Sequence, residues 1–134
     1  MENNTFQLLP PLERARHFHH LMTHEGISQT ELARRFKKSL AFISNTLRLL
    51  KLPAFIQDGL AGGSISEGHA RALLTVQDTH KMIGVYREVL VTNATVRQTE
   101  RMAREANREI VLNKKEVESI QTSEAANSGK PPVR

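Results

Sequence analysis

Signals that begin or end a helix recur at short intervals along this chain, and they constrain its fold more than any other feature. Prolines and Ser or Thr residues with capping spacing begin segments of helical periodicity, and glycines or a proline end them. The alternation of β-branched or aromatic residues with polar ones, which indicates a half-buried strand, is absent from the sequence. We therefore predict an all-α fold, a multi-helix domain of about seven helices.

Individual start and stop residues place these helices along the chain. Ser28 with Glu31 and Thr95 with Gln98 have the spacing of capping boxes, in which each side chain bonds the backbone N–H of the other residue. Gly26 ends the first helix, because glycine readily adopts the left-handed conformation that follows a helix. The predicted helices cover approximately residues 10–24, 29–36, 39–52, 53–62, 66–74, 79–91 and 95–112.

Length and composition favour a single domain followed by a tail. With 134 residues, of which 39% are hydrophobic, the chain can form one modest core. No apolar run reaches the roughly 20 residues of a membrane span, residues 1–10 lack the basic-then-apolar layout of a signal peptide, and cysteine is absent, so we expect a cytoplasmic protein without disulfides. We expect residues 1–9 to be a linker or a remnant of an upstream domain, and residues 10–112 to form the helical domain. Residues 113–134 are expected to be a flexible tail, because "TSEAANSGKPPVR" offers too little apolar surface to become ordered.

The positive charge is concentrated in one segment. Between residues 28 and 51, six basic residues and Glu31 give a net charge of +5, which equals that of the whole chain, so the remainder sums to zero. The six basic residues are Arg34, Arg35, Lys37, Lys38, Arg48 and Lys51. A localised basic segment attracts polyanions, of which nucleic acid is the commonest in a cell, although a merely solvated face is the alternative explanation.

The same segment has the spacing of a helix-turn-helix. Numbered from Gln29, the stretch "QTELARRFKKSLAFISNTL" places Ala33 fifth, Phe36 eighth and Ile43 fifteenth. A small residue is needed where the two helices cross, and apolar residues are needed where the second helix rests on the first. Many such motifs carry glycine at the ninth position for a left-handed turn, where this chain has Lys37. Either the lysine accepts the strain, or the turn differs slightly.

The second helix of this pair is expected to have two opposite sides. At about 100° per residue, Ile43, Leu47 and Leu50 fall on the core side, and Phe42 and Leu49 fall between the two sides. The outer side carries small or polar residues, namely Ala41, Ser44, Asn45 and Arg48. Small residues permit close approach, and Asn and Arg can bond base edges or phosphates, so this side suits a major groove about 12 Å wide.

Three motifs, in this order and at these distances, resemble the central DNA-binding domain of ParB/Spo0J-type partition proteins. They are "ISQTELARRFKKSLAFISNTLRLLKLP", "GSISEGHARALL" and "ATVRQTE", and the resemblance covers about residues 8–107. It implies sequence-specific binding of double-stranded DNA at an inverted-repeat, centromere-like site in plasmid or chromosome partition. It also implies contacts from the recognition helix and from the start of the "GHARALL" helix. The expected DNA-binding residues are Gln29, Thr30, Lys37, Lys38, Ser39, Leu40, Ala41, Ser44, Asn45, Arg48, Lys51, Gly68, His69 and Arg71.

The chain also departs from the family that it resembles. Leu40 stands where members usually carry arginine, so a guanine contact worth about 1–3 kcal/mol is lost and the operator is expected to differ. Family members bind a cytidine nucleotide upstream, whereas "MENNTFQLLPP" retains Glu2 and Asn3 but has Phe6 in place of an arginine. The stretch "GLAGGS" lacks the Lys and Ser or Thr of a P-loop. We therefore expect no cofactor, no nucleotide hydrolysis and no enzymatic activity.

The expected partners follow from the same resemblance. Two copies of the chain are expected to occupy one inverted repeat, while the isolated chain is monomeric. Because a C-terminal dimerisation domain is not found, the chain is interpreted as a fragment whose full-length form is a homodimer with a ParA-type ATPase partner. The alternatives are a ParB-like transcriptional regulator with the same helix-turn-helix, and a basic protein-interaction module that pairs with acidic partners.

Two further groups of residues allow more than one interpretation. His17, His20 and His24 lie on one side of the first helix, with a spacing that could bind a metal. We favour a solvated face, because no carboxylate accompanies them as a catalytic base. Four arginines form a stripe on the last helix, namely Arg97, Arg101, Arg104 and Arg108. We interpret this stripe as a charged face paired with neighbouring glutamates rather than as a phosphate contact.

Overall fold

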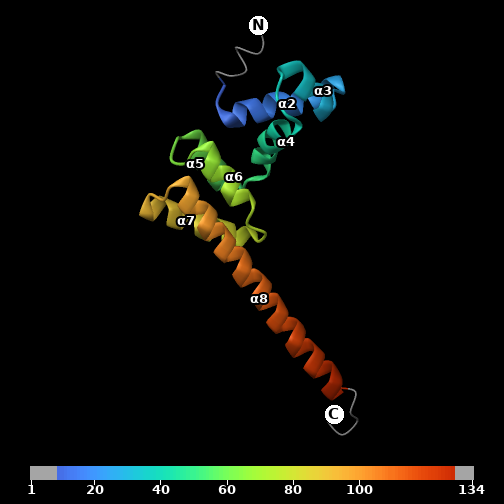
Figure 1. Ribbon diagram of the computed structural model, residues 1–134, viewed down its shortest axis with the longest axis vertical. Helices are drawn as coiled ribbons and strands as arrows, with labels where there is room; N and C mark the ends of the chain where they lie inside the picture. The colour runs from blue at the N-terminus through green and yellow to red at the C-terminus, as the bar shows by residue number, and fades with distance from the viewer. Residues whose placement is uncertain (1–8, 129–134) are drawn as a thin grey trace.

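The computed structural model describes the backbone of residues 9–128 and the side chains of residues 9–119. Over this range the chain folds into seven α-helices and one short 3-10 helix, without a β-strand (Figure 1). They are α2 (Pro11–Glu25), α3 (Gln29–Phe36), α4 (Leu40–Arg48), η1 (Leu49–Lys51), α5 (Ala54–Ala61), α6 (Glu67–Leu74), α7 (Thr79–Thr92) and α8 (Val96–Ser128). The predicted all-α, multi-helix fold is confirmed.

The helices begin at residues whose side chains can cap them. Ser28 Oγ accepts a hydrogen bond from the backbone N–H of Glu31 (3.1 Å), and Ser39 Oγ accepts one from that of Phe42 (3.0 Å). Thr95 and Gln98 form the predicted capping box through bonds of 3.1 and 2.8 Å. These bonds satisfy backbone donors that a helix N-terminus otherwise leaves free, so local sequence specifies where the helices begin.

The core consists of two clusters of buried side chains. The first lies among α2, α3 and α4, and its buried members are Phe18, Ile27, Leu32, Phe36 and Ile43. The second lies among α5, α6, α7 and α8 and also receives Leu12 from the start of α2, and Leu49 and Leu52 from η1 and the residue after it. The chain therefore passes from one cluster to the other directly after α4, and the end of α4 is held by the second cluster.

The third predicted helix ends earlier than expected. α4 ends at Arg48 and the chain tightens into η1, although we expected one continuous helix up to the following proline. The tighter turn buries Leu49 completely and leaves Leu50 only half-buried, whereas the periodicity of a continuous helix placed Leu50 on the core side. The side chain of Gln57 holds this turn, since its Nε2 donates hydrogen bonds to the carbonyl oxygens of Leu50 (3.1 Å) and Leu52 (3.0 Å).

The last helix, α8, is longer than predicted. We expected it to end near Leu112, but it continues to Ser128. The intervening sequence has neither glycine nor proline and includes several good helix formers, so no local signal stops the helix. The C-terminal half of α8 projects away from the rest of the chain, and every side chain from Val111 to Ser119 is exposed (Figure 1). A flexible tail stays a prediction, and residues 129–134 lie outside the described range.

Glu2, Asn3 and Phe6 also lie outside the described residues, so the suggested remnant of an upstream domain stays a prediction. Along residues 9–128, none of the helices combines the length and the apolar composition that crossing a bilayer requires.

Candidate nucleic-acid interface

α4 has one buried side and one exposed side, as the sequence predicts. Ile43 is fully buried in the first cluster, and Leu47 packs against that cluster. Thr46 is three residues after Ile43, which places it on the same side of the helix, and it is also fully buried although its side chain is polar. On the opposite side, Ala41 and Arg48 are exposed. This side of α4 is therefore open to a partner.

Three further predicted contact residues lie along the same helix. Leu40, at its start, is 50% exposed although it is apolar. Ser44 and Asn45 are partly buried. Ser44 Oγ donates a hydrogen bond to Gln29 Oε1 (2.7 Å), which connects the middle of α4 to the start of α3. Gln29 therefore lies beside the recognition helix, and the next residue, Thr30, is exposed.

The turn before α4 contains two lysines that differ in accessibility. Lys37 adopts the left-handed conformation (φ 57°, ψ 45°), so the lysine accepts a strain of about 1 kcal/mol that glycine would avoid. Its side chain is exposed, whereas Lys38 is partly buried, with its Nζ 5.1 Å from the centre of the Phe42 ring. Lys37 is therefore the more available of the two to a phosphate. Ser39, which caps α4, is exposed.

The basic side chains of α3 are already paired with a carboxylate. Arg34 and Arg35 each donate a hydrogen bond to Glu31 from Nε (3.2 Å), and Arg34 Nη2 donates a further short one. These bonds, above all those from Arg34, hold the pKa of the Glu31 carboxyl below its ordinary value and raise the pKa of Arg34. The capping box predicted at Ser28 is half formed, because the Glu31 carboxylate bonds the arginines instead of the Ser28 N–H.

At the start of α6, the imidazole of His69 is bonded within the protein. Its Nδ1 accepts a hydrogen bond from the backbone N–H of Ser66 (3.0 Å), while Ser66 Oγ accepts one from the His69 N–H (3.3 Å). Because Nδ1 accepts, Nε2 carries the proton and donates to the carbonyl oxygen of Ala94 (2.8 Å). The usual capping box has Glu or Gln at this position, so the sequence does not signal the role of the histidine.

Gly68 allows α6 and α8 to approach each other closely. A Cβ atom at this position would lie 3.0 Å from Val96 Cγ2 and 3.3 Å from Val96 Cγ1. Helix packing therefore gives this glycine a role inside the protein, and the residue is only partly exposed.

Arg71 extends from the exposed side of α6, and a neighbouring carboxylate orients it. Glu67 Oε2 lies 3.6 Å from Arg71 Nη1, while Glu67 Oε1 accepts a 2.5 Å hydrogen bond from Arg14 Nη2 of α2. The Arg14 side chain is 13% exposed and the Arg71 side chain 50%, so only Arg71 is accessible to a partner. Lys51, at the end of η1, is exposed as well.

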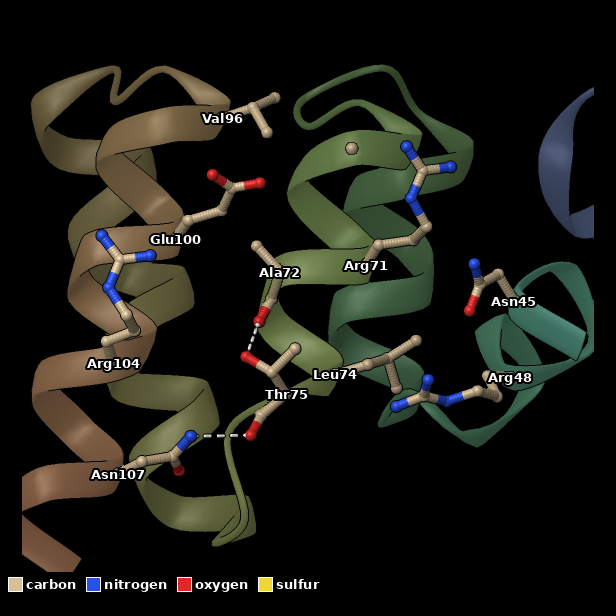
Figure 2. A pocket seen from close by; sticks show the side chains of 11 residues that line it. Asn45, Arg48, Arg71, Ala72, Leu74, Thr75, Val96, Glu100, Arg104 and Asn107 are labelled. Carbon is tan, nitrogen blue, oxygen red and sulfur yellow. Dashed lines mark hydrogen bonds between the residues drawn. The ribbon is translucent and has the colours of Figure 1, made fainter. Parts of the chain in front are cut away.

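The exposed side of α4 borders a cleft of about 420 Å³, with α6 as its floor and α4 and α8 as its walls (Figure 2). Asn45 and Arg48 line the cleft from α4, Arg71 lines it from α6, and Glu100 and Arg104 line it from α8. The sequence alone assigns Arg104 to a solvated stripe. Helical periodicity indicates which residues share a side of a helix, but it does not reveal which neighbouring helix that side meets.

The histidines of α2 do not share one solvated face, contrary to the prediction. His17 is partly buried, and its ring lies edge-on to that of Phe36 with 6.2 Å between ring centres. His20 and His24 are exposed, with ring centres 4.4 Å apart. The packing of α3 against α2 accounts for the burial of His17. Within the described part of the chain, no group of three or more His, Cys, Asp or Glu side chains is placed to hold a metal ion.

Comparison with known protein families and sequences gives consistent matches. A family model described as the ParB HTH domain matches residues 7–108. The chain is 35% identical over 120 residues to stage 0 sporulation protein J of Bacillus subtilis (strain 168), covering 90% of this chain and 43% of that protein. It is 41% identical over 100 residues to a probable chromosome-partitioning protein ParB of Treponema pallidum, covering 75% of this chain and 31% of that protein. The chain thus spans less than half the length of these relatives.

Two solved structures share the fold. One is the C-terminally truncated chromosome-partitioning protein ParB of Caulobacter crescentus complexed to the centromeric parS site, with a TM-score of 0.67, 33% identity, and coverage of 74% of this chain and 51% of that chain. The other is the DNA-binding domain of a chromosome-partitioning protein ParB complexed to the centromeric parS site. It has a TM-score of 0.68, 33% identity, and coverage of 74% of this chain and 79% of that chain.

Proposed function

The chain belongs to the ParB HTH domain family, and we propose from that premise that it binds double-stranded DNA at an inverted repeat in plasmid or chromosome partition. The observation that carries this proposal is the exposed side of α4, where Ala41 and Arg48 are accessible beside the partly exposed Asn45. Two relatives of the same fold are complexed to a centromeric parS site, which supports the same role for this chain.

In the proposed complex α4 lies in the major groove and reads the bases. Asn45 and Arg48 bond base edges, while Ala41 and Ser44 permit close approach of the helix. Leu40, an exposed apolar residue at the start of α4, contacts a thymine methyl group instead of a guanine. The preferred operator therefore differs from that of relatives with arginine at this position.

The remaining proposed contacts position the helix on the duplex and carry little sequence information. His69 is not among the side chains that we propose to touch DNA, because both of its ring nitrogens are bonded within the protein. It supports the start of α6 from inside. The proposed positioning contacts are Gln29, Thr30, Lys37, Lys38, Ser39, Lys51, Gly68 and Arg71.

The partners and the location of the protein form part of the same proposal. Two copies occupy the two half-sites of one inverted repeat, because a two-fold operator matches two identical domains. A full-length form acts as a homodimer with a ParA-type ATPase on plasmid or nucleoid DNA in the cytoplasm. DNA binding of this kind requires neither a cofactor nor a catalytic step.

Selection of preferred duplexes from a random pool, followed by binding titrations across salt, tests the proposal. We expect a palindromic sequence to be enriched and to bind more tightly than its scrambled version. The logarithm of the binding constant should fall by about 0.9 per phosphate contacted for each tenfold increase in salt. Equal binding of palindromic and scrambled duplexes would instead favour a basic module that pairs with acidic proteins.

A further inference from the structure

We infer, on the basis of the proposed DNA binding, that the cleft between α4 and α8 holds a phosphate of the DNA backbone and that Arg104 supplies one of its cations. The ligand required is a phosphodiester oxyanion. The DNA interface would then extend beyond the helix-turn-helix and the start of α6 to the first half of the last helix.

Three arginines from three different helices line the cleft. Arg48 extends from α4, Arg71 from α6 and Arg104 from α8, around the floor that α6 forms (Figure 2). Glu100 is the only carboxylate in the lining, so three cations and one anion leave a net charge of +2. Within the described residues, Arg71 lies 3.6 Å from Glu67, and neither Arg48 nor Arg104 forms an ion pair. Cations gathered in one cleft repel one another, so the arrangement favours entry of an anion.

The position of the cleft points to the DNA backbone as the source of that anion. Asn45 and Arg48 belong both to the exposed side of α4 and to the cleft wall. A helix that enters a major groove about 12 Å wide has sugar-phosphate backbone on either side of it. Lys37 lies in the turn before α4, whereas the cleft lies beside its last turn. The turn lysine and the cleft can therefore contact phosphates at opposite ends of the recognition helix.

The α8 wall of the cleft is attached to the α6 floor at two points. Asn107 of α8 donates a hydrogen bond from Nδ2 to the carbonyl oxygen of Thr75 (2.8 Å), and its Oδ1 accepts one from the Gln77 N–H (3.0 Å) (Figure 2 shows the first). Val96 packs against Gly68 at the other end of α6. Arg104 projects from α8 between these two attachments, so the backbone that carries it is placed relative to α6 before any ligand binds.

Arg104→Ala and Arg101→Ala form a matched pair for the test. Both remove one positive charge from an exposed position on α8, but only Arg104 lines the cleft. Titrations of the selected palindromic duplex across salt should give an affinity about three- to tenfold lower for Arg104→Ala, with a salt slope smaller by about 0.9. Arg101→Ala should keep the slope of the unmodified chain. An unchanged slope for Arg104→Ala, or equal reductions in both variants, would overturn the inference.

A substitution that is expected to raise the affinity gives a second test, because a misfolded variant would not bind DNA more tightly. Glu100→Gln removes the only carboxylate from the cleft, so it should strengthen duplex binding by about two- to threefold. Glu88→Gln removes an exposed carboxylate from α7 and should leave the affinity nearly unchanged. Equal effects of these two substitutions would indicate overall charge rather than the cleft, and would count against the inference.

Two further measurements distinguish failure of this inference from failure of the proposed DNA binding, and a DNA phosphate from a small anionic ligand. Asn45→Ala is assayed with the same palindromic duplex and its scrambled version. If Asn45→Ala loses the preference for the palindrome while Arg104→Ala keeps the salt slope of the unmodified chain, the cleft is rejected as a phosphate site but the proposed DNA binding stands. If no palindrome is enriched for the unmodified chain, DNA binding itself fails. A nucleoside triphosphate titrated without DNA should not bind saturably. Saturable binding that Arg104→Ala abolishes and Arg101→Ala retains would assign the cleft to a free phosphate ligand instead.

Discussion

Two basic surfaces of this protein differ in how their positive charges are used. On α3, the carboxylate of Glu31 bonds both Arg34 and Arg35. In the cleft beside α4, the guanidinium groups of Arg48 and Arg104 form no ion pair within the described residues. A count of charged residues along the sequence gives Arg34 and Arg48 equal weight. In the structure, however, the carboxylate of Glu31, within one helical turn, offsets part of the positive charge on α3. The net charge of a segment therefore overestimates what that segment offers to DNA.

The sharpest test of this contrast replaces one arginine from each surface. Arg48→Ala should weaken binding to the selected duplex by about 1–3 kcal/mol, which corresponds to about 5- to 150-fold, because it removes a base contact. Arg34→Ala removes the same charge from the surface paired with Glu31 and should change the affinity less than about twofold. Fluorescence anisotropy titrations compare the two. Similar losses in both variants would mean that the pairing on α3 does not distinguish the surfaces.

A second test asks whether the side chain of Gln57 holds the 3-10 turn at the end of α4. Gln57→Ala removes two hydrogen bonds to the carbonyl oxygens of Leu50 and Leu52, so the free energy of unfolding should fall by about 1–2 kcal/mol. The control is Gln77→Ala. Within the described residues Gln77 forms a hydrogen bond through its backbone N–H alone, so the substitution removes no side-chain hydrogen bond. Chemical denaturation measures both. If Gln57→Ala were as stable as the control, the 3-10 turn would be held by packing alone.

Freeing Arg34 and Arg35 from Glu31 should have a smaller effect, and it should strengthen DNA binding rather than weaken it. Glu31→Gln removes the carboxylate that bonds Arg34 and Arg35, so binding to a scrambled duplex should strengthen by about twofold and become more salt-dependent. Glu88→Gln also removes one negative charge, but from α7, and serves as the control. Identical behaviour of the two variants would show that the arginines of α3 lie away from the DNA path.

The smallest expected effect is a dependence of stability on pH. The pKa of Glu31 is lowered in the folded state by its hydrogen bonds from Arg34 and Arg35, so its stabilising contribution is present above the unfolded value and is lost as pH falls through the folded value. The thermal midpoint of the unmodified chain should therefore exceed that of Glu31→Gln at neutral pH, and the difference should shrink below pH 4.5, the ordinary value. A difference that stays constant into the acid range would contradict this contribution.

Most of the fold could be predicted from the sequence, because the decisive signals are local. Ser28, Ser39 and Thr95 each bond a backbone N–H three residues ahead, and such caps act within one turn of helix. Gly26 ends α2 in the left-handed conformation expected of it. The two-sided character of α4 also follows from spacing alone, since Ile43 is buried and Ala41 is exposed.

The remaining features depend on contacts between elements far apart in the sequence. Burial of Leu49 rather than Leu50 follows from the 3-10 turn that joins α4 to the second core cluster. The inward role of His69 requires the carbonyl oxygen of Ala94, and the place of Arg104 in a cleft requires α4 and α6 as neighbours. Periodicity within one helix contains no information about such partners. For this reason the recognition helix was predictable, whereas the cleft beside it was not.

Titration of the isotope-labelled chain with the selected duplex, followed by backbone amide chemical shifts, tests the central claim most directly. If the outer side of α4 enters the major groove, the largest changes should occur at Ala41, Ser44, Asn45 and Arg48, with smaller ones at the start of α6. The amides of Arg34 and Arg35 should change little. Large changes on α3 together with an unperturbed α4 would contradict the account.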